Sequence, residues 1–197
     1  MSSVSSDLLS IQPYRQTSGQ VRRDIALLMH RVWPDQSAPS QGETVPEEHD
    51  PALDALSCFI YRGNRLLSYA AVLNFTLSHA GQTFRVAALS CVATDPAYQK
   101  QGLSSLVVSA ATRCIENSHA DIGLFTCDPP LASFYAKAGW PAVSGVAVIG
   151  SHDAGALSST ELGKVVLFRL LSEHAHDHAA AFTNTTLSLG LPLGQFV

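Results

Sequence analysis

The chain has 197 residues, of which 46% are hydrophobic and 14% are charged, so one domain has enough apolar material for a packed core. Its net charge of -4 argues against a nucleic-acid binder, which needs a basic surface to attract phosphates. The first ten residues lack the basic and apolar regions of a signal peptide, and no apolar run approaches the roughly 18 residues of a membrane span. We therefore expect a cytoplasmic protein.

The four cysteines support the same location. They stand at Cys58, Cys91, Cys114 and Cys127, and no pair has the CxxC spacing of a zinc or redox site. Each falls inside an apolar strand or helix pattern. We interpret them as buried, reduced thiols and predict neither a disulfide framework nor a metal site.

The N-terminal part begins with a predicted strand over residues 8–15. A helix follows, with Ser18 as its N-cap, an apolar stripe at helical spacing, and an end near Trp33 because the next residue is a proline. Residues 34–52 contain four prolines and no large apolar cluster. We predict a loop or a short irregular helix there, long enough to act as a lid.

The pattern then changes to that of strands. Segments 56–62, 65–79 and 82–94 are rich in β-branched, aromatic and aliphatic residues. Short turns at residues 62–64 and 80–81, both containing glycine, separate them. These three segments predict an antiparallel meander.

The second half alternates helices and strands. An apolar repeat at three and four residues predicts a long helix from Gly102 to Ile115. The remaining predicted elements are a buried strand at 121–127, a helix at 129–138, strands at 143–149 and 164–171, and a short helix and tail over 172–197. This order predicts an α/β sandwich with a mixed sheet.

The junction at residues 92–104 is the most informative stretch. A strand ends at Asp95, a short loop follows, and the long helix begins near Gly102. Such a turn directs unpaired backbone amides at one point, with the positive end of the helix dipole behind them, and this geometry binds a pyrophosphate. The alternative is a mere connection. Neither GxxxxGK[ST] nor GxGxxG is present, and further side-chain donors are expected from Lys100, Ser104 and Ser105.

Two motifs carry a resemblance to a known family. Gln99–Ser104 (QKQGLS) resembles the Q/R-x-x-G-x-G/A signature of GNAT acetyltransferases, with Ser104 where a glycine or alanine is usual. Phe134–Trp140 (FYAKAGW) is similar to the family's FYxKxGF-type segment and begins 30 residues after Ser104. The resemblance implies a GNAT-like, mostly antiparallel central sheet flanked by helices, with splayed central strands. It assigns residues 1–171 to the acyltransferase domain, with 172–197 packing on it, in a homodimer.

Acetyl-CoA is the co-substrate that this resemblance implies. Backbone groups of Val92 and Thr94 would hold the pantetheine arm where strands 82–94 and 121–127 diverge. The amide of Cys91 or Val92 would polarise the thioester carbonyl and stabilise the developing oxyanion. The implied cofactor-binding residues are Cys91, Val92, Thr94, Gln99, Lys100, Gln101, Gly102, Leu103, Ser104 and Ser105.

Direct transfer to an amine needs an acid and a base. Tyr135 matches the motif tyrosine and is the candidate acid for the departing thiolate. Alternatively, it is a core aromatic with a solvated hydroxyl. Asp128 precedes Pro129 as a natural N-cap of the helix that carries Tyr135, and we assign it a catalytic role as a candidate base.

The sequence does not identify the general base. Many relatives place a glutamate on the central strand, where this chain has Leu89–Cys91 (LSC), and neither Ser90 nor Cys91 is a suitable base for an ammonium. The candidates that act through water are Asp128, Glu47, Glu48, His49, Asp50 and the C-terminal carboxylate.

The acceptor is predicted to be a primary amine of a small molecule. Loop 34–52 has five acids and no lysine or arginine, which suits a polyamine or an aminoglycoside, although a solvated polar loop explains it as well. The layout is similar to that of aminoglycoside 2'-N-acetyltransferases, but the ending, Leu191–Val197, differs from theirs. The rival hypotheses are a catalytically silent acyl-CoA-binding module and an enzyme that transfers a longer acyl chain.

The histidines near the C-terminus raise a separate alternative. On a helix, His174 and His178 share a face that can bind a metal. No third ligand lies nearby in the sequence, so we favour a solvated helix face and predict no metal.

Overall fold

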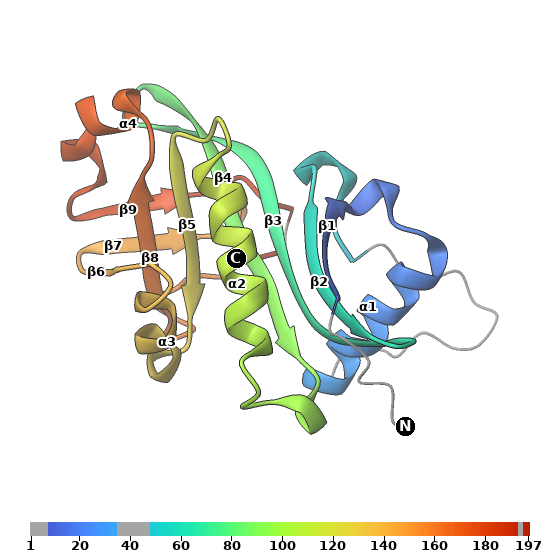
Figure 1. The fold of residues 1–197 in the computed structure, drawn as a ribbon. Coiled ribbons are helices and arrows are strands. Elements are labelled where there is room, and N and C mark those ends of the chain that lie inside the picture. Colours follow the sequence, from blue (N-terminus) through green and yellow to red (C-terminus); the bar gives the residue numbers. More distant parts are fainter. Residues whose placement is uncertain (1–7, 35–47, 193–194) are drawn as a thin grey trace. The chain divides into compact units, whose positions relative to one another are not determined.

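The computed structural model describes residues 8–34, 48–192 and 195–197 (Figure 1). Within them, a seven-stranded sheet has the order β1-β2-β3-β4-β5-β8-β6, and β7 and β9 form a two-stranded sheet. In the large sheet β4–β5 is parallel, whereas β1–β2, β2–β3, β5–β8 and β6–β8 are antiparallel. The predicted mixed, mostly antiparallel sheet with flanking helices is confirmed.

Residue contacts divide the chain into two compact units. Unit 1 comprises Met1–Leu73 and Ser90–Arg113, and unit 2 comprises Asn74–Leu89 and Cys114–Val197. Three elements contribute residues to both units: β3 (Arg65–His79), β4 (Gln82–Thr94) and α2 (Leu103–Glu116). None of the described helices combines the length and the apolar content needed to cross a lipid bilayer.

Unit 1 begins with strand β1 (Leu8–Pro13), which pairs with β2 (Leu56–Arg62). The predicted strand 8–15 was two residues too long, because Tyr14 starts a 3-10 helix, η1 (Tyr14–Gln16), and its ring is buried. Helix α1 (Gly19–Val32) lies beside β1 and β2 (Figure 1). The predicted cap is confirmed, since the Ser18 hydroxyl accepts a hydrogen bond from the amide of Val21 at 3.2 Å.

The predicted loop 34–52 falls mostly outside the described residues. Its described end contains a short 3-10 helix, η2 (Pro51–Leu53), capped by Asp50. The predicted meander is confirmed by β2, β3 and β4, whose bounds match the three predicted segments.

In unit 2, β5 (Ile122–Cys127) pairs with β8 (Val165–Leu170) over its whole length (Figure 1). Its parallel pairing with β4 is shorter and joins Val86–Ala88 to Ile122–Leu124. β4 continues to Thr94 and β5 to Cys127 beyond these pairs.

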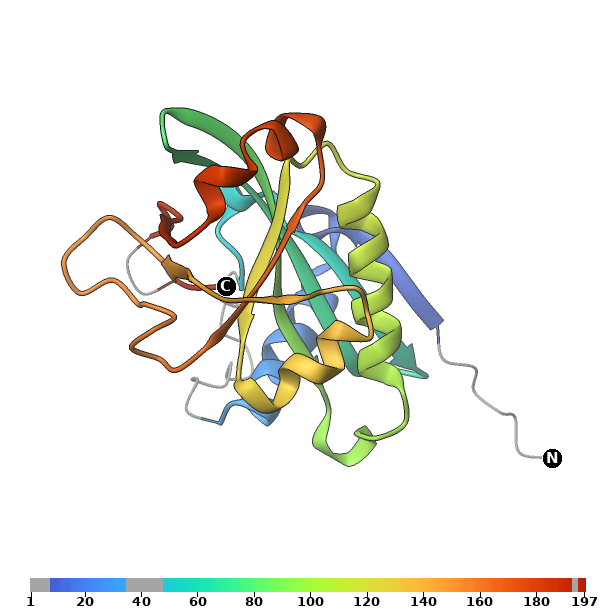
Figure 2. The ribbon, with the colours of Figure 1, turned by 90° about the vertical axis from the view of Figure 1, so that its left-hand side faces the viewer.

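Two predicted elements of unit 2 were wrong in detail. The helix predicted at 129–138 is a 3-10 turn, η4 (Pro129–Leu131), followed by the five-residue α3 (Ala132–Ala136) at the Cys127 end of β5 (Figure 2). Two prolines at its start and Gly139 at φ +85 after it keep the helix short. The strand predicted at 143–149 is two strands, because Gly145 at φ +74 breaks it into β6 (Ala142–Val143) and β7 (Val146–Ile149).

The C-terminal segment belongs to unit 2. Helix α4 (Glu173–Asp177) is followed by a 3-10 helix, η5 (Ala179–Phe182), and by β9 (Thr185–Ser188), which pairs in parallel with β7. The Ser172 hydroxyl donates to Asp121 at 2.7 Å, and a ring nitrogen of His79 lies 2.8 Å from the carbonyl oxygen of Ala181. The sequence pattern did not predict β9.

Candidate functional site

The junction between β4 and α2 is held by a buried carboxylate. Asp95 is 1% exposed, and it accepts hydrogen bonds from Arg65 at 2.8 Å and from the amide of Ala97 at 3.1 Å. The Arg31 Nε lies 3.0 Å from the same carboxylate as an ion pair without an aligned hydrogen bond. Burial acts to raise the pKa of Asp95, but the hydrogen bonds and the arginine charges outweigh it and lower the pKa. Asp95 therefore fixes the start of the turn.

The turn itself needs two residues with positive φ. After η3 (Pro96–Tyr98), Lys100 has φ +61 and Gly102 has φ +82. A Cβ added to Gly102 would meet no atom within 4 Å, so the space in front of it is open. Glycine is required there by its backbone conformation, because side chains make this region unfavourable.

The first turn of α2 offers backbone donors that lack an intrahelical acceptor. The amide of Leu106 donates to the carbonyl of Gly102 at 3.1 Å, and this is the bond that opens the helix. The four amides from Gly102 to Ser105 precede it and have no intrahelical acceptor. With the positive end of a 14-residue helix behind them, these amides suit a diphosphate. The residues present therefore fit the diphosphate of coenzyme A.

A chain of hydroxyls joins this turn to β3. The Thr94 hydroxyl lies 2.7 Å from that of Ser104 and 2.7 Å from that of Ser68, which donates to the carbonyl of Ala93 at 3.0 Å. Ser104 is thus already hydrogen-bonded within unit 1. The side chains of Gln99, Lys100, Gln101 and Ser105 are exposed, whereas Leu103 is buried in the core.

The end of β4 departs from regular strand geometry at Cys91, whose φ is +50. Burial, followed by the negative charge of Glu48, raises the pKa of the Cys91 thiol to about 12. The thiol therefore stays protonated and is no nucleophile, as expected. The adjacent Val92 is half-buried.

Tyr135 in unit 2 is buried, with 6% of its surface exposed. Its ring contacts Phe125 edge-on at 4.8 Å, and Phe125 contacts Trp140 in the same way at 5.0 Å. Burial raises the pKa of the phenol, so the hydroxyl is protonated at neutral pH. Within residues 8–34, 48–192 and 195–197 no hydrogen bond reaches this hydroxyl.

The predicted cap at Asp128 is only partly present. Asp128 precedes Pro129, but its carboxylate makes no capping hydrogen bond. It pairs instead with the Lys164 ammonium at 2.6 Å, and its side chain is 61% exposed. The carboxylate is therefore engaged by Lys164 at the surface of unit 2.

Comparison with known proteins decides the family. A model of the acetyltransferase (GNAT) domain matches residues 14–143, a range that contains both motifs. The chain belongs to the GNAT acetyltransferase family. It is therefore an acyltransferase, and acetyl-CoA is the co-substrate of the family.

Solved structures share the GNAT fold at low sequence identity. An acyl-CoA N-acyltransferase from Pseudomonas aeruginosa has a TM-score of 0.57 at 17% identity, and the match covers 83% of this chain and 99% of that one. ElaA from Escherichia coli has a TM-score of 0.57 at 13% identity, with the same coverage. A GNAT acetyltransferase from Brucella melitensis, in complex with acetyl-CoA, has a TM-score of 0.51 at 18% identity and coverages of 68% and 84%. No curated protein matches this chain significantly.

Unit 1 of this GNAT protein also contains a buried cluster of polar aromatic side chains around His49, which the sequence pattern did not predict. His49 is buried, its Nε2 lies 2.7 Å from the Tyr69 hydroxyl, and its ring contacts Tyr14 edge-on at 4.9 Å. The Tyr69 hydroxyl in turn lies 3.0 Å from that of Ser57. Glu48 and His49 appeared in the sequence only as two of several loop acids and bases, because their partners are 20 or more residues away.

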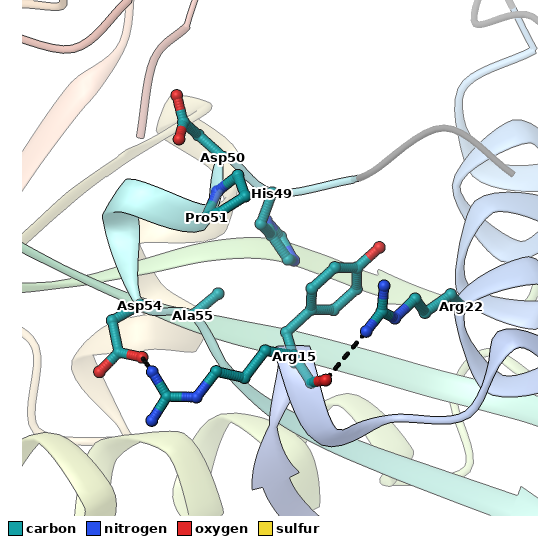
Figure 3. Close-up of a pocket in the computed structure, with 8 residues that line it drawn as sticks. Arg15, Arg22, His49, Asp50, Pro51, Asp54 and Ala55 are labelled. Atoms are coloured by element: carbon teal, nitrogen blue, oxygen red, sulfur yellow. Dashed lines mark hydrogen bonds and ion pairs between the residues drawn. The ribbon is translucent and has the colours of Figure 1, made fainter.

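A small cavity of about 110 Å³ adjoins this cluster (Figure 3). Its charged side chains are engaged with other groups of unit 1. Arg15 pairs with Asp54 at 2.9 Å, and Arg22 donates to the carbonyl oxygen of Arg15 at 2.9 Å. Figure 3 shows the His49 ring and the Asp50 carboxylate pointing in different directions from adjacent backbone. We assign no ligand to this cavity.

The histidines of α4 pack on an aromatic ring. His174 stacks on Phe84 with ring centroids 5.0 Å apart, and His178 contacts the same ring edge-on at 6.0 Å. Both are half-buried, whereas His176 and Asp177 are exposed, so the predicted solvated helix face is present only in part. Among the described residues, no group of three or more histidine, cysteine or acidic side chains is arranged to hold a metal ion.

Proposed function

We propose that this GNAT protein transfers an acetyl group from acetyl-CoA directly to a primary amine of a small molecule. The observation that carries the proposal is the start of α2, where four amides lack intrahelical acceptors beside an open Gly102 at φ +82. The family supplies the co-substrate, and this turn supplies donors of the right kind for its diphosphate. The acceptor is the part that needs an experiment.

Acetyl-CoA brings the acetyl thioester, and the chain's residues hold and polarise it. The amides from Gly102 to Ser105 bind the diphosphate, with the exposed Lys100 ammonium adding positive charge. Backbone groups of Val92 and Thr94 hold the pantetheine arm. The amide of Cys91 or Val92 donates to the thioester oxygen as negative charge develops on it.

Proton movements complete the transfer. The acceptor enters as an ammonium, loses one proton to a base and attacks with its lone pair, so that an N–C bond forms and the C–S bond breaks. Tyr135 gives its proton to the departing thiolate, and the second amine proton replaces it. A protonated, buried phenol without a hydrogen-bond partner among the described residues suits this role. Asp128, the other candidate, is held by Lys164.

Aminoglycosides and polyamines are the acceptor classes that we propose first. The support is the acidic loop 34–52, whose described acids are Glu48 and Asp50. Cationic amines are attracted to such a loop. We also propose a cytoplasmic homodimer, with residues 1–171 as the acyltransferase domain and 172–197 packed on it. The four free cysteines support a reducing location.

The rival function is a catalytically silent acyl-CoA-binding module. It is favoured by the segment Leu89–Cys91, which has no acidic side chain. A thiol-release assay with aminoglycosides, polyamines and amino acids separates the two. We expect CoA release with at least one amine, and a loss of about 10²- to 10⁴-fold in Tyr135→Phe. CoA binding by calorimetry without release from any amine would favour the silent module, and tighter binding of long-chain acyl-CoA would favour a longer acyl group.

A further inference from the structure

We propose that Glu48 is the general base that takes the proton from the acceptor ammonium. This inference rests on the proposed function and names a residue for its unassigned step. Four candidates lie in the loop before β2: Glu47, Glu48, His49 and Asp50. Of these, Glu47 lies outside the described residues.

Two of the remaining candidates are already engaged. The Asp50 carboxylate accepts a hydrogen bond from the amide of Ala52 at 2.8 Å, as the cap of η2. His49 is buried against Tyr69, and burial lowers its pKa to about 4. The His49 ring is buried, and its Nε2 already has the Tyr69 hydroxyl as a partner at 2.7 Å.

Glu48 differs from the other acids of unit 1. Its side chain is half-buried, and within the described parts of the chain its carboxylate has no hydrogen bond and no ion pair. By contrast, Asp95 is held by arginines, and Asp24 accepts from the Tyr61 hydroxyl at 2.7 Å. A carboxylate with its lone pairs free is available to a substrate proton.

The backbone around Glu48 is fixed on both sides. The amide of Glu48 donates to the Tyr14 hydroxyl at 3.0 Å, and the next residue, His49, is tied to Tyr69, which lies 3.0 Å from Ser57. Two tyrosines from η1 and β3 therefore anchor this end of the loop. A base on an anchored segment keeps its position relative to β3 and β4 within unit 1.

The anchoring contacts bring the segment of Glu48 to the end of β4. His49 is bonded to Tyr69 of β3, and the preceding residue, Ser68, donates to the carbonyl of Ala93 on the neighbouring strand β4 at 3.0 Å. Burial raises the pKa of Cys91 and that of Tyr69, and the negative charge of Glu48 acts in the same direction. Cys91 belongs to the segment proposed to hold the thioester carbonyl. Glu48 thus takes the place of the acid that Leu89–Cys91 lacks.

Burial also tunes Glu48 for the task. It raises the pKa of the carboxyl group above its usual value of 4.5, and no cation among the described residues counteracts this. A carboxylate with a higher pKa is a stronger base. In the step itself, one N–H bond of the ammonium breaks, its electron pair stays on nitrogen, and the proton goes to a Glu48 oxygen and then to water.

The decisive variant is Glu48→Gln, with Glu161→Gln as the matched control because Glu161 is exposed in unit 2. With an amine that wild type acetylates, we expect kcat/KM to fall about 10²- to 10⁴-fold in Glu48→Gln and to stay unchanged in Glu161→Gln. CoA affinity measured by calorimetry should be the same in all three proteins. Glu48→Asp should restore part of the activity.

The pH profile adds a readout that a structural role does not move. In wild type, kcat/KM should fall as the pH drops through the Glu48 pKa, because the base must be ionised, and Glu48→Gln should lack this limb. The other titratable groups around Glu48 are Tyr14, His49, Tyr69 and Cys91, from η1, the loop, β3 and β4. Burial lowers the pKa of His49 and raises that of Tyr69 and of Cys91, so none of these three changes its charge between pH 5 and 8.

A second measurement is independent of activity. Removing the Glu48 charge should lower the pKa of Cys91, so Cys91 should be alkylated by iodoacetamide several-fold faster in Glu48→Gln, measured by mass spectrometry at pH 9. Equal alkylation in both proteins, or full activity of Glu48→Gln, overturns the base assignment while the proposed function stands. Wild type that acetylates no amine overturns the proposed function, and the assignment with it.

Discussion

The two family motifs of this chain act in opposite ways. Gln99–Ser104 in unit 1 leaves its side chains largely exposed, has backbone amides without an intrahelical acceptor and has open space in front of Gly102. Phe134–Trp140 in unit 2 buries Tyr135 and Trp140, and the Trp140 ring lies over Gly123, where an added Cβ would come within 2.8 Å of it. The first motif has the backbone donors that we propose for a diphosphate, whereas the second motif mainly packs.

The two motifs match the family equally well in the sequence, but their residues have different structural roles. A glycine in the first motif is required by a backbone with φ +82, whereas the tryptophan of the second fills a space next to Phe125. Tyr135 combines the two roles. Its ring is packed against Phe125, while its hydroxyl has no hydrogen-bond partner among the described residues. Substitutions in the two motifs should therefore affect different measurements.

The largest effect is expected from Trp140→Ala. The fully buried ring contacts Phe125 and lies under the Arg169 guanidinium at 5.3 Å, so its removal should lower the free energy of unfolding by about 3–5 kcal/mol. Urea denaturation measures this. Trp140→Phe is the control and should lose less, and a loss below about 1 kcal/mol in Trp140→Ala would contradict the packing role.

The second largest effect is expected from Gly102→Val, which should weaken the binding of CoA. A branched side chain strains the backbone at φ +82 and fills the space proposed for the diphosphate, so the Kd for CoA should rise about 10- to 100-fold by calorimetry. Gly155→Val is the matched control, because Gly155 has φ +85 and equally open space but lies in unit 2. If both variants bind CoA like wild type, the proposed diphosphate site is wrong.

The smallest effect concerns acid stability in unit 2. Asp121 accepts hydrogen bonds from Arg85 and Ser172, and these bonds, led by that of Arg85, hold its pKa well below the usual range despite burial. A lowered folded-state pKa stabilises the fold above the unfolded-state value near pH 4, and the contribution is lost as the pH falls further. Asp121→Asn should therefore flatten the decline in urea stability from pH 5 to pH 3. An unchanged decline would mean that other carboxylates cause it.

Much of the fold was predictable because local patterns agree with it. The stripe of α1, the Ser18 cap and the three strands of the meander each depend on neighbouring residues, and all were confirmed. The helix at 129–138 and the strand at 143–149 were predicted wrongly because prolines and glycines interrupt them locally, whereas β9 was missed because a contact distant in sequence decides it. β9 exists because it pairs with β7, and the segment predicted at 143–149 divides between two sheets.

The candidate site likewise has one part that the local sequence predicts and one part that depends on tertiary contacts. The predicted turn from Asp95 to Gly102 could be located from the order of strand, glycine and helix, since its geometry is local. Glu48 could not be separated from its neighbours, because what distinguishes it is the burial and anchoring supplied by Tyr14 and Tyr69. In the sequence, Glu48 and Asp50 are simply two acidic residues of the same loop.

The sequence by itself determined the family, the backbone turn at Gly102 and the order of the elements, because propensities, caps and motif spacing act over a few residues. Only the tertiary structure decided which ionisable groups are free, paired or desolvated. Asp128 was occupied by Lys164, 36 positions away, and the pKa of Glu48 was raised by the packing around it. Proton affinity depends on the surroundings in space, and a chain brings those together only when it folds.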